Sequence, residues 1–272
     1  MRNKLTISAL ALLALSVSAM PTFAQAVRTG FDSVNFPGND DGSVGPVSIG
    51  FAQPINFFGG MYSQLYVNNN GNVTFDNPLS TFTPFDLFTA NRVIIAPFFG
   101  DVDTRNSNDT MYGSGMVGGN AAFGVSWRDV GYFSRANDKL NTFQLVMIDR
   151  TDTGAGNFDF ELNYDKIQWE TGGFSGGSGG LGGSSARAGY SNGDPMFSFE
   201  LPGSAVNGAL LDTNMVSGLI YNSLNSNVSG RYLFNVRNGA VAPNVPEPGT
   251  IALLVVGAGS GLLLRRKRSA RA

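Results

Sequence analysis

Three carboxylates that could bind a cation follow a buried apolar segment. Asp101 and Asp103 come directly after the apolar run in Asn91–Phe99, and Asp109 lies a few residues downstream. Alternate carboxylates at a strand end can share a hard cation such as calcium, which takes six or more oxygen ligands. Calcium bound by Asp101, Asp103 and Asp109 is one hypothesis. The sequence favours the other, a solvated acidic turn with Arg105 as charge partner, because too few ligands are placed.

Much catalytic chemistry is excluded by composition, because the 272 residues include no Cys and no His. Disulfides, Cys/His zinc sites, Cys nucleophiles and Ser-His-Asp triads therefore cannot form. The G-x-G-x-x-G run at 113–118 precedes a predicted strand instead of a helix, which argues against a dinucleotide site. The G-x-S-x-G run at 176–180 has no His partner. We expect no cofactor other than the calcium considered above.

Paired carboxylates for glycoside cleavage form a further candidate. Apart from Glu247 near the C-terminus, the Glu residues downstream of the predicted leader are Glu161, Glu170 and Glu200. Sequence spacing does not supply the separation between carboxylates that glycosidases require. We therefore expect a protein that is not an enzyme. A glycan-processing enzyme acting on exopolysaccharide is kept as an alternative, in which Glu161→Gln or Glu170→Gln would abolish turnover.

The N-terminus has the pattern of an export signal. Arg2 and Lys4 precede an apolar stretch, Leu5–Met20, and small-residue cleavage sites end at Ala24 and Ala26. We predict that residues 1–24 are a signal peptide, that signal peptidase cleaves after Ala24 or Ala26, and that the chain is exported through the inner membrane.

The C-terminus combines three segments in a fixed order. An extended Pro-containing turn comes first, an uncharged apolar run second and a basic cluster third: Val245, Pro246, Glu247, Pro248; Ile251–Leu264; Arg265, Arg266, Lys267, Arg268. As a helix the run would span roughly 21 Å, short of the roughly 30 Å hydrocarbon core. The basic cluster would act as a membrane stop on the cytoplasmic side. This order favours a processing signal with a transient tether over a permanent anchor.

This three-part tail resembles the PEP-CTERM sorting signal of Gram-negative bacteria. The resemblance covers about the last two dozen residues and includes Val245–Pro248, the apolar run and the basic cluster. It implies processing by an exosortase-type membrane protease in a host that makes extracellular polysaccharide. It also implies a mature form at the cell surface or in the matrix of a biofilm. We therefore assign 241–272 to a linker and sorting tail.

The charge of the middle part disfavours a nucleic-acid partner. Seven of the 18 basic residues lie in residues 1–24 and 249–272, whereas all 20 acidic residues lie between them, which leaves 11 basic residues and a net charge of −9 for 25–248. Such a surface repels nucleic acid and attracts cations.

Alternating apolar residues predict an all-β, antiparallel, sandwich-like domain over 25–240. The segments Phe123–Trp127 and Phe158–Tyr164 alternate cleanly, and Phe143–Ile148 is apolar on both sides, as expected of a central strand. Phe158–Tyr164 is expected to have one buried and one solvated face. The parity of apolar residues changes at Ile167, which predicts a bulge near Asp165–Lys166.

Turn signals separate these strands. Asn-Gly within Asn68–Asn72 predicts a hairpin. Gly172–Gly183 is expected to be a flexible loop, pinned in part by Phe174 and Leu181. A short helix is expected over Ala205–Leu211 or Asn214–Leu224.

A second resemblance rests on the strand segments. They are Val93–Arg105, Ser126-Trp127, Tyr132-Phe133, Asn141–Leu145, Tyr164–Trp169 and Ala186–Ser191. Together they resemble the extracellular NIDO (nidogen-like) domain, with a core over 51–237. The resemblance implies a non-catalytic domain of matrix and adhesive proteins, and hence cell–matrix adhesion with an extracellular polysaccharide or matrix protein as partner.

Four aromatic residues are candidates for contacting such a partner. They are Tyr132, Phe133, Phe174 and Tyr190; the alternative is that they belong to the core or pin loops. A self-assembling structural coat protein is kept as a further functional alternative.

Overall fold

The computed structural model of the protein describes residues 25–242. The predicted signal peptide, the cleavage residue Ala24, the sorting signal Val245–Pro248 and the membrane stop Arg265–Arg268 lie outside the described residues. In 25–242 no helix has the length and apolar character that crossing a membrane requires.

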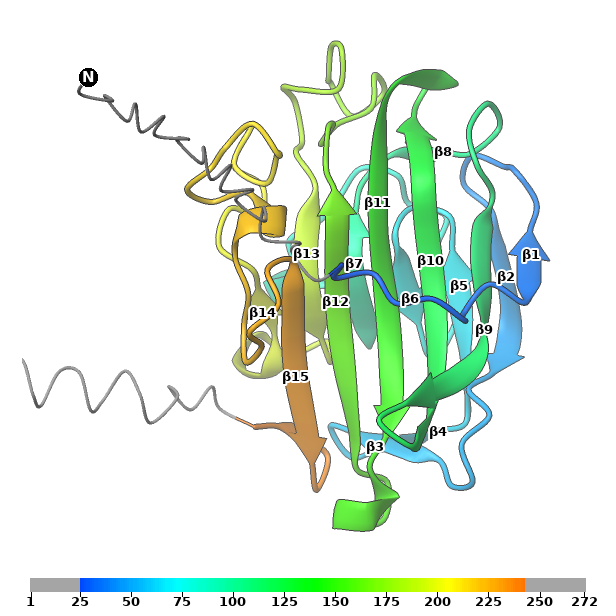
Figure 1. The fold of residues 1–272 in the computed structure, drawn as a ribbon. Coiled ribbons are helices and arrows are strands. Elements are labelled where there is room, and N and C mark those ends of the chain that lie inside the picture. Colours follow the sequence, from blue (N-terminus) through cyan, green and yellow to red (C-terminus); the bar gives the residue numbers. More distant parts are fainter. Residues whose placement is uncertain (1–24, 243–272) are drawn as a thin grey trace, which may run out of the picture.

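Two antiparallel sheets form a sandwich, which confirms the predicted fold class (Figure 1). The larger sheet runs in the order β1 (Val34–Phe36), β9 (Thr110–Val117), β10 (Asn120–Tyr132), β11 (Ala136–Asp149), β12 (Phe158–Lys166), β15 (Arg231–Arg237), β16 (Ala240–Val241), with β8 (Val102–Asp103) pairing to β10. The smaller sheet runs in the order β14 (Phe199–Glu200), β13 (Arg187–Ser191), β7 (Ile94–Phe99), β6 (Asn72–Thr74), β5 (Gln64–Asn68), β2 (Ser43–Ser48).

Short elements complete the described fold. A separate hairpin joins β3 (Ile55–Phe57) to β4 (Gly60–Tyr62), and there are four 3-10 turns: η1 (Leu87–Thr89), η2 (Thr151–Thr153), η3 (Pro195–Phe197), η4 (Leu219–Tyr221).

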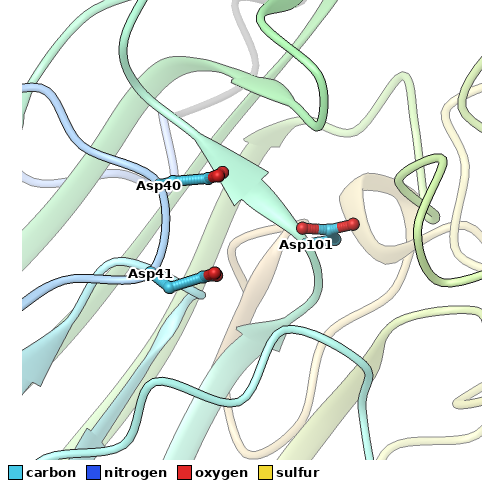
Figure 2. Close-up of side chains that lie close together, drawn as sticks. All are labelled: Asp40, Asp41 and Asp101. Atoms are coloured by element: carbon cyan, nitrogen blue, oxygen red, sulfur yellow. The ribbon is translucent and has the colours of Figure 1, made fainter.

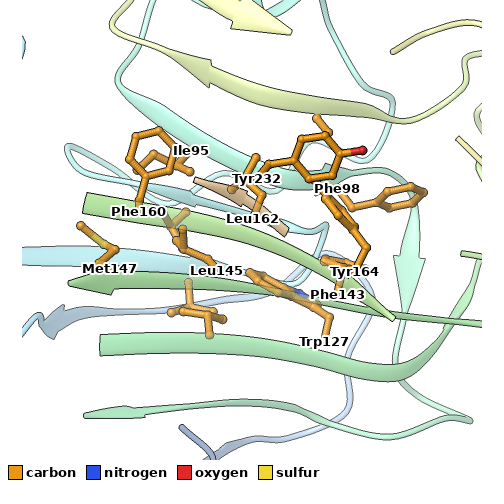
Figure 3. Packing of buried hydrophobic residues seen from close by; sticks show 14 of the residues in the cluster. Ile95, Phe98, Trp127, Phe143, Leu145, Met147, Phe160, Leu162, Tyr164 and Tyr232 are labelled. Carbon is orange, nitrogen blue, oxygen red and sulfur yellow. The ribbon is translucent and has the colours of Figure 1, made fainter. Parts of the chain in front are cut away.

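The core lies between the facing sheets. Alternate residues of β10, β11 and β12 point inward, as strand geometry requires, and meet side chains of β7 (Figure 3). Trp127, Phe143 and Leu162 from the larger sheet and Phe98 from the smaller one are all 0% exposed. Trp127 stacks on its cross-strand neighbour Phe143 with ring centroids 5.1 Å apart. The ring of Phe98 in the smaller sheet lies 5.2 Å from that of Phe143, so aromatic packing also joins the two sheets.

The central positions of two apolar strands are confirmed. β7 is buried along its whole length and pairs with β6 and β13. β11 lies between β10 and β12, and both faces of Leu145–Ile148 are buried. A strand that is covered on both faces needs no polar alternation, which is why these two segments read as continuous apolar runs.

The predicted bulge in β12 is also present. Phe143 of β11 pairs with Tyr164, while the preceding Thr142 pairs with Lys166, so Asp165 has no partner in the ladder. The extra residue changes the parity, and Ile167 is therefore buried like Tyr164.

The prediction that β12 has one solvated face is wrong. Asp159, Glu161 and Asn163 are all at most 4% exposed. The segment that precedes β1 crosses the outer face of the larger sheet, where it is drawn in blue in Figure 1. Its Phe31 packs on Val146 and Ile148 of β11. The polar residues of β12 are therefore covered by the segment that precedes β1 and are not solvated.

The predicted short helix is replaced by turns. Residues 202–218 form successive turns, and only η4 within Asn214–Leu224 is helical, as a single 3-10 turn. The loop at Gly172–Gly183 is held by backbone hydrogen bonds, among them Gly177 N to Gly172 O at 3.0 Å and Glu170 N to Gly180 O at 2.8 Å. Leu181 packs against the core as expected, but the loop as a whole is more structured than its composition predicts.

The predicted Asn-Gly hairpin joins β5 to β6 and lies beside other loops. Asn69 N donates to Gly42 O at 2.9 Å, and Gly100 N donates to Asn70 O at 3.3 Å. The hairpin turn, the β1–β2 loop and the turn after β7 therefore meet at one end of the sandwich.

Candidate functional site

Three carboxylates converge where these loops meet. Asp40 and Asp41 lie in the β1–β2 loop, and Asp101 lies in the turn between β7 and β8. One oxygen from each carboxylate lies within 4.8 Å of the others. Figure 2 shows Asp40 and Asp41 projecting side by side from their loop toward the turn that carries Asp101. Sixty residues of sequence separate the two contributions.

One hypothesis from the sequence places Asp101 with Asp103 and Asp109. In the structure the carboxylates that converge with Asp101 are those of the β1–β2 loop instead. Asp103 is 0% exposed and is bound by Arg105, with Nε to Oδ1 at 2.9 Å and Nη2 to Oδ2 at 2.5 Å. Its Oδ2 also accepts from Arg135 N at 2.7 Å. Asp109 instead accepts from Asn35 Nδ2 at 2.8 Å. Arg105 is the expected charge partner of this acidic turn, and in the structure it binds Asp103, whereas the carboxylates grouped with Asp101 are Asp40 and Asp41.

Two buried asparagines of the β5–β6 hairpin hold the loops of the site in place. Asn69 Nδ2 donates to Val102 O at 2.6 Å and also to Asp40 O. Asn70 Oδ1 accepts from Val102 N at 2.9 Å, while its Nδ2 donates to Asp41 Oδ1 at 2.8 Å. Each amide thus connects the β1–β2 loop to the turn after β7. Fully satisfied buried amides of this kind fix the geometry of a site before any ligand arrives.

Two carboxylate oxygens of the cluster have no hydrogen-bond partner among residues 25–242. Asp101 is 1% exposed, and no group among residues 25–242 donates to its buried Oδ2. Asp40 Oδ1 is also buried without a partner, although its Oδ2 contacts Arg105 Nη2 at 3.0 Å. Buried carboxylate oxygens are normally hydrogen-bonded, since leaving them unpaired costs free energy. These two atoms therefore mark a place where a positive group would be stabilised.

The electrostatics of the cluster oppose ionisation. Burial, followed by repulsion from Asp40, Asp41 and Asp103, raises the pKa of Asp101 to about 7. Burial and the neighbouring carboxylates raise the pKa of Asp40 to about 6. In contrast, the pKa of Asp103 is lowered, because hydrogen bonds from Arg105 and Arg135 outweigh the effect of its burial. The arrangement thus concentrates more negative charge than its cations neutralise.

A group of three aromatic side chains, of which Phe174 is exposed and the other two are partly buried, adjoins the acidic cluster. Phe174 is 74% exposed, and its ring lies 4.9 Å from that of Phe133 and 6.3 Å from that of Phe82. Phe133 N donates to Asp101 O at 3.1 Å, and Phe133 O accepts from Gly173 N at 3.1 Å. We call Phe82, Phe133 and Phe174 the loop-end aromatic group.

Two of the four predicted contact residues belong to the core instead. Tyr132 is 6% exposed, lies 5.5 Å from the ring of Trp169 and donates from its hydroxyl to Asp138 at 2.9 Å. Tyr190 packs against the core and stacks on Phe199 with centroids 5.9 Å apart. Only Phe133 and Phe174 remain available as surface contacts.

The glutamates considered for catalysis make structural contacts. Glu161 receives two hydrogen bonds from Arg28, at 2.6 and 2.8 Å. Glu170 accepts from Gly208 N and Leu210 N at 2.6 and 2.7 Å, and Glu200 is paired with Arg187 at 2.7 Å. Each carboxylate is thus occupied by a partner that holds two segments together.

Sequence reasoning missed several residues of this region. The sequence predicts no role for Asp40 and Asp41, and it predicts only a hairpin turn at Asn69 and Asn70. The Asp-Asp-Gly of the first and the three consecutive asparagines of the second were the available signals. Phe82 carries no signal of its own, because a lone aromatic in a loop is as often a packing residue.

Comparison with known proteins shows which family the described domain resembles. The chain matches the profile of the nidogen-like domain (NIDO) over residues 63–117 and 113–238. It is 33% identical over 233 residues to alpha-tectorin of mouse and, equally, of human, covering 76% of this chain and 10% of either relative. It is 31% identical over 227 residues to nidogen of Drosophila melanogaster, covering 72% of this chain and 15% of that protein.

The chain therefore spans only about a tenth of the length of the tectorins that it matches. No solved structure matches it.

Proposed function

Because the chain belongs to the nidogen-like domain family, we propose that it is an exported surface or extracellular-matrix protein that takes part in adhesion. The observation that carries the proposal is the family match across most of the described sandwich. The tectorin and nidogen relatives are extracellular matrix proteins, which supports a matrix role for this chain. A non-enzymatic role is supported by the structural contacts of Glu161, Glu170 and Glu200.

The loop-end aromatic group is the contact surface that we propose. Phe174 is 74% exposed, and two further rings lie beside it. Apolar groups that gather at a surface, unlike single exposed side chains, mark interaction sites. Aromatic faces stack on the apolar faces of sugar rings and pack against protein side chains. The extracellular polysaccharide of the host is therefore the partner to test first.

The proposed export and processing fit the limits of the folded part. Ala26 N and Val27 N donate to Asp165 Oδ1 at 3.0 and 3.2 Å, and Ala26 is 2% exposed. Cleavage after Ala24 would keep these contacts, whereas cleavage after Ala26 would remove the first of them. The last strand of the described residues ends at Val241, so cutting at the proposed Val245–Pro248 signal by an exosortase-type protease would keep every strand of 25–242.

Binding of the full-length exported protein to matrix polysaccharide tests adhesion. We expect Phe174→Ala to weaken binding about tenfold or more, since hot-spot aromatics dominate such contacts. Met215→Ala is the matched control, because Met215 is 77% exposed on another loop. Equal binding by wild type and Phe174→Ala would exclude this surface. If the wild-type protein does not bind, adhesion fails, and sedimentation would then test the self-assembling coat.

Processing is tested in the host. Replacing Pro246, Glu247 and Pro248 together by Ala is expected to leave the protein in the membrane fraction with its tail attached. N-terminal sequencing of the wild-type exported form is expected to begin at Gln25. Unchanged release of the triple variant would contradict the proposed sorting signal.

A further inference from the structure

We propose that Asp40, Asp41 and Asp101 form a calcium site at the loop end of the sandwich. The proposal rests on geometry and does not depend on the adhesive function proposed above. The three carboxylates come from two segments that the fold brings together. Asp103 and Asp109, which the sequence had suggested, are not ligands in this arrangement.

The spacing of the carboxylates suits one shared cation. Two oxygens bound to one calcium ion at 2.3–2.6 Å can be separated by at most about 5 Å. All three carboxylates place an oxygen within 4.8 Å of the others. A chain without Cys or His lacks thiolate and imidazole ligands, which excludes the usual zinc sites, and three carboxylates favour a hard cation.

The unpaired oxygens provide a second, independent indication. Asp101 Oδ2 is buried with no donor within residues 25–242, although the residue is 1% exposed. The backbone of Gly172 lies against the same oxygen, since a Cβ on Gly172 would lie 2.2 Å from it. A side chain at 172 would therefore occupy the space beside Oδ2. A solvated acidic turn, the alternative favoured by the sequence, would leave this oxygen in water.

The charge balance also calls for a cation. Asp101 is repelled by Asp40, Asp41 and Asp103, and the cation that acts on it is Arg105. Arg105 is already bound to Asp103 and contacts Asp40 through only one oxygen. A divalent ion would offset the remaining negative charge where the arginine does not reach.

The ligand count predicts modest affinity. Asp40 Oδ2 is engaged by Arg105 and Asp41 Oδ1 by Asn70, so only some of the six carboxylate oxygens are available. Water would complete the shell. Calcium sites with few protein ligands in extracellular modules have Kd values of about 10⁻⁴–10⁻³ M. We expect this range.

The site would also order the adjacent loops. A bound ion would link the β1–β2 loop to the turn after β7, and this turn carries the hydrogen bond from Phe133 N to Asp101 O. The ion would thus stabilise the position of the loop-end aromatic group without contacting it.

Thermal unfolding of the full chain with the metal alone tests the site. With 10 mM CaCl₂ against NaCl of equal ionic strength, we expect Tm to rise by about 3–10 °C for a domain of this size. Calorimetric titration should give one site per chain. Magnesium should give a smaller shift, because it demands tighter octahedral geometry. Absence of both the shift and the heat of binding would overturn the proposal.

Isosteric variants locate the ion. Asp101→Asn should abolish the calcium-dependent shift, whereas Asp109→Asn, on a carboxylate bound by Asn35, should keep it. Asp41→Asn is the second ligand variant, in case Asp101→Asn does not fold. Retention of the shift in both ligand variants would overturn the assignment, as would its loss in Asp109→Asn. Because calcium binding is measured without polysaccharide, its failure is distinct from failure of adhesion.

Discussion

At the scale of single residues, the buried charges divide into paired and unpaired ones. Glu161 is 3% exposed and is satisfied by Arg28, with Arg231 at 3.6 Å. Asp101 is equally buried, but its carboxylate has no such cation bound to it. The first arrangement fastens the N-terminal segment to β12, whereas the second leaves the fold with an unfavourable charge. Removing the paired charge of Glu161 should therefore destabilise the protein, whereas removing the unpaired charge of Asp101 should not.

Glu161→Gln should destabilise the protein by about 1–3 kcal/mol, because Arg28 and Arg231 would lose the carboxylate that neutralises them. Urea unfolding measures the change. Asp138→Asn is the control: it removes the exposed pair with Lys139, which should contribute under about 1 kcal/mol, while the Asn Oδ1 can still accept from the Tyr132 hydroxyl. Loss of a hydrolytic activity with unchanged stability would instead revive the glycan-processing alternative.

Stability in the presence of a chelator should depend on pH through the acidic cluster. The pKa of Asp101 is raised to about 7 and that of Asp40 to about 6, from 3.8. The folded state thus binds more protons than the unfolded state between about pH 4 and 7, and stability falls as pH rises across this window. We expect Tm without metal to be higher at pH 5 than at pH 7.5.

In Asp101→Asn this pH dependence should be weaker, and calcium should oppose it in the wild type. A Tm that rises from pH 5 to pH 7.5 in the presence of a chelator would show that the acidic cluster does not dominate the pH dependence of stability.

At the scale of elements, the segment that crosses the outer face of the larger sheet completes the fold. Phe31 is 1% exposed and packs on Ala122, Val146 and Ile148. Gly124 of β10 makes this possible, because a Cβ there would lie 2.5 Å from the Phe31 ring. A glycine inside a strand thus marks the close approach of a second segment.

Phe31→Ala should cost about 3–5 kcal/mol, as expected for a fully buried ring whose site cannot collapse. Chemical unfolding gives the value. Phe174→Ala is the matched aromatic control, because Phe174 is 74% exposed and should change stability by less than about 0.5 kcal/mol. A similar loss in both variants would indicate that the segment does not cover the sheet in solution.

The β5–β6 turn depends on Gly71. Its φ is +73°, and a Cβ there would lie 1.8 Å from Phe98 O. Gly71→Ala should therefore destabilise by more than about 2 kcal/mol, through strain and a clash with the backbone of β7. Gly118→Ala is the control, with φ +57° and nothing within 4 Å of the added methyl, so it reports strain alone. Equal effects would mean that the close approach to β7 is not tight.

At the scale of the whole molecule, the described sandwich has a hydrophobic core that lies between its two sheets. The chain from Gln25 to Val241 includes both sheets and the covering segment.

A fragment covering residues 25–242 should therefore fold independently. Its Tm should match that of the mature exported protein within about 2 °C, because both sheets and the covering segment lie within residues 25–242. Differential scanning calorimetry of both forms measures this. A fragment that starts at Val27 should be less stable, since it loses the buried Ala26. Failure of the 25–242 fragment to fold would show that the ends contribute to stability.

The sequence by itself determined the all-β class, the central β11, the buried β7 and the bulge at Asp165. Strand periodicity and its change of parity are local properties that a single segment displays. It also allowed the resemblance to the nidogen-like family, which the family match confirmed. Composition alone excluded Cys and His chemistry.

Only the tertiary structure decided what covers each surface and which carboxylates meet. The polar face of β12 looked solvated because alternation cannot reveal a segment from more than a hundred residues away, such as Arg28 against Glu161. Likewise Asp40 and Asp41 join Asp101 only because Asn69 and Asn70 connect their loops. Asp101 and Asp103 are only two residues apart, but Asp101 lies in the turn before β8, so strand alternation does not place the two carboxylates on one face. Contacts across loops depend on the packing of the sheets, which no local pattern encodes.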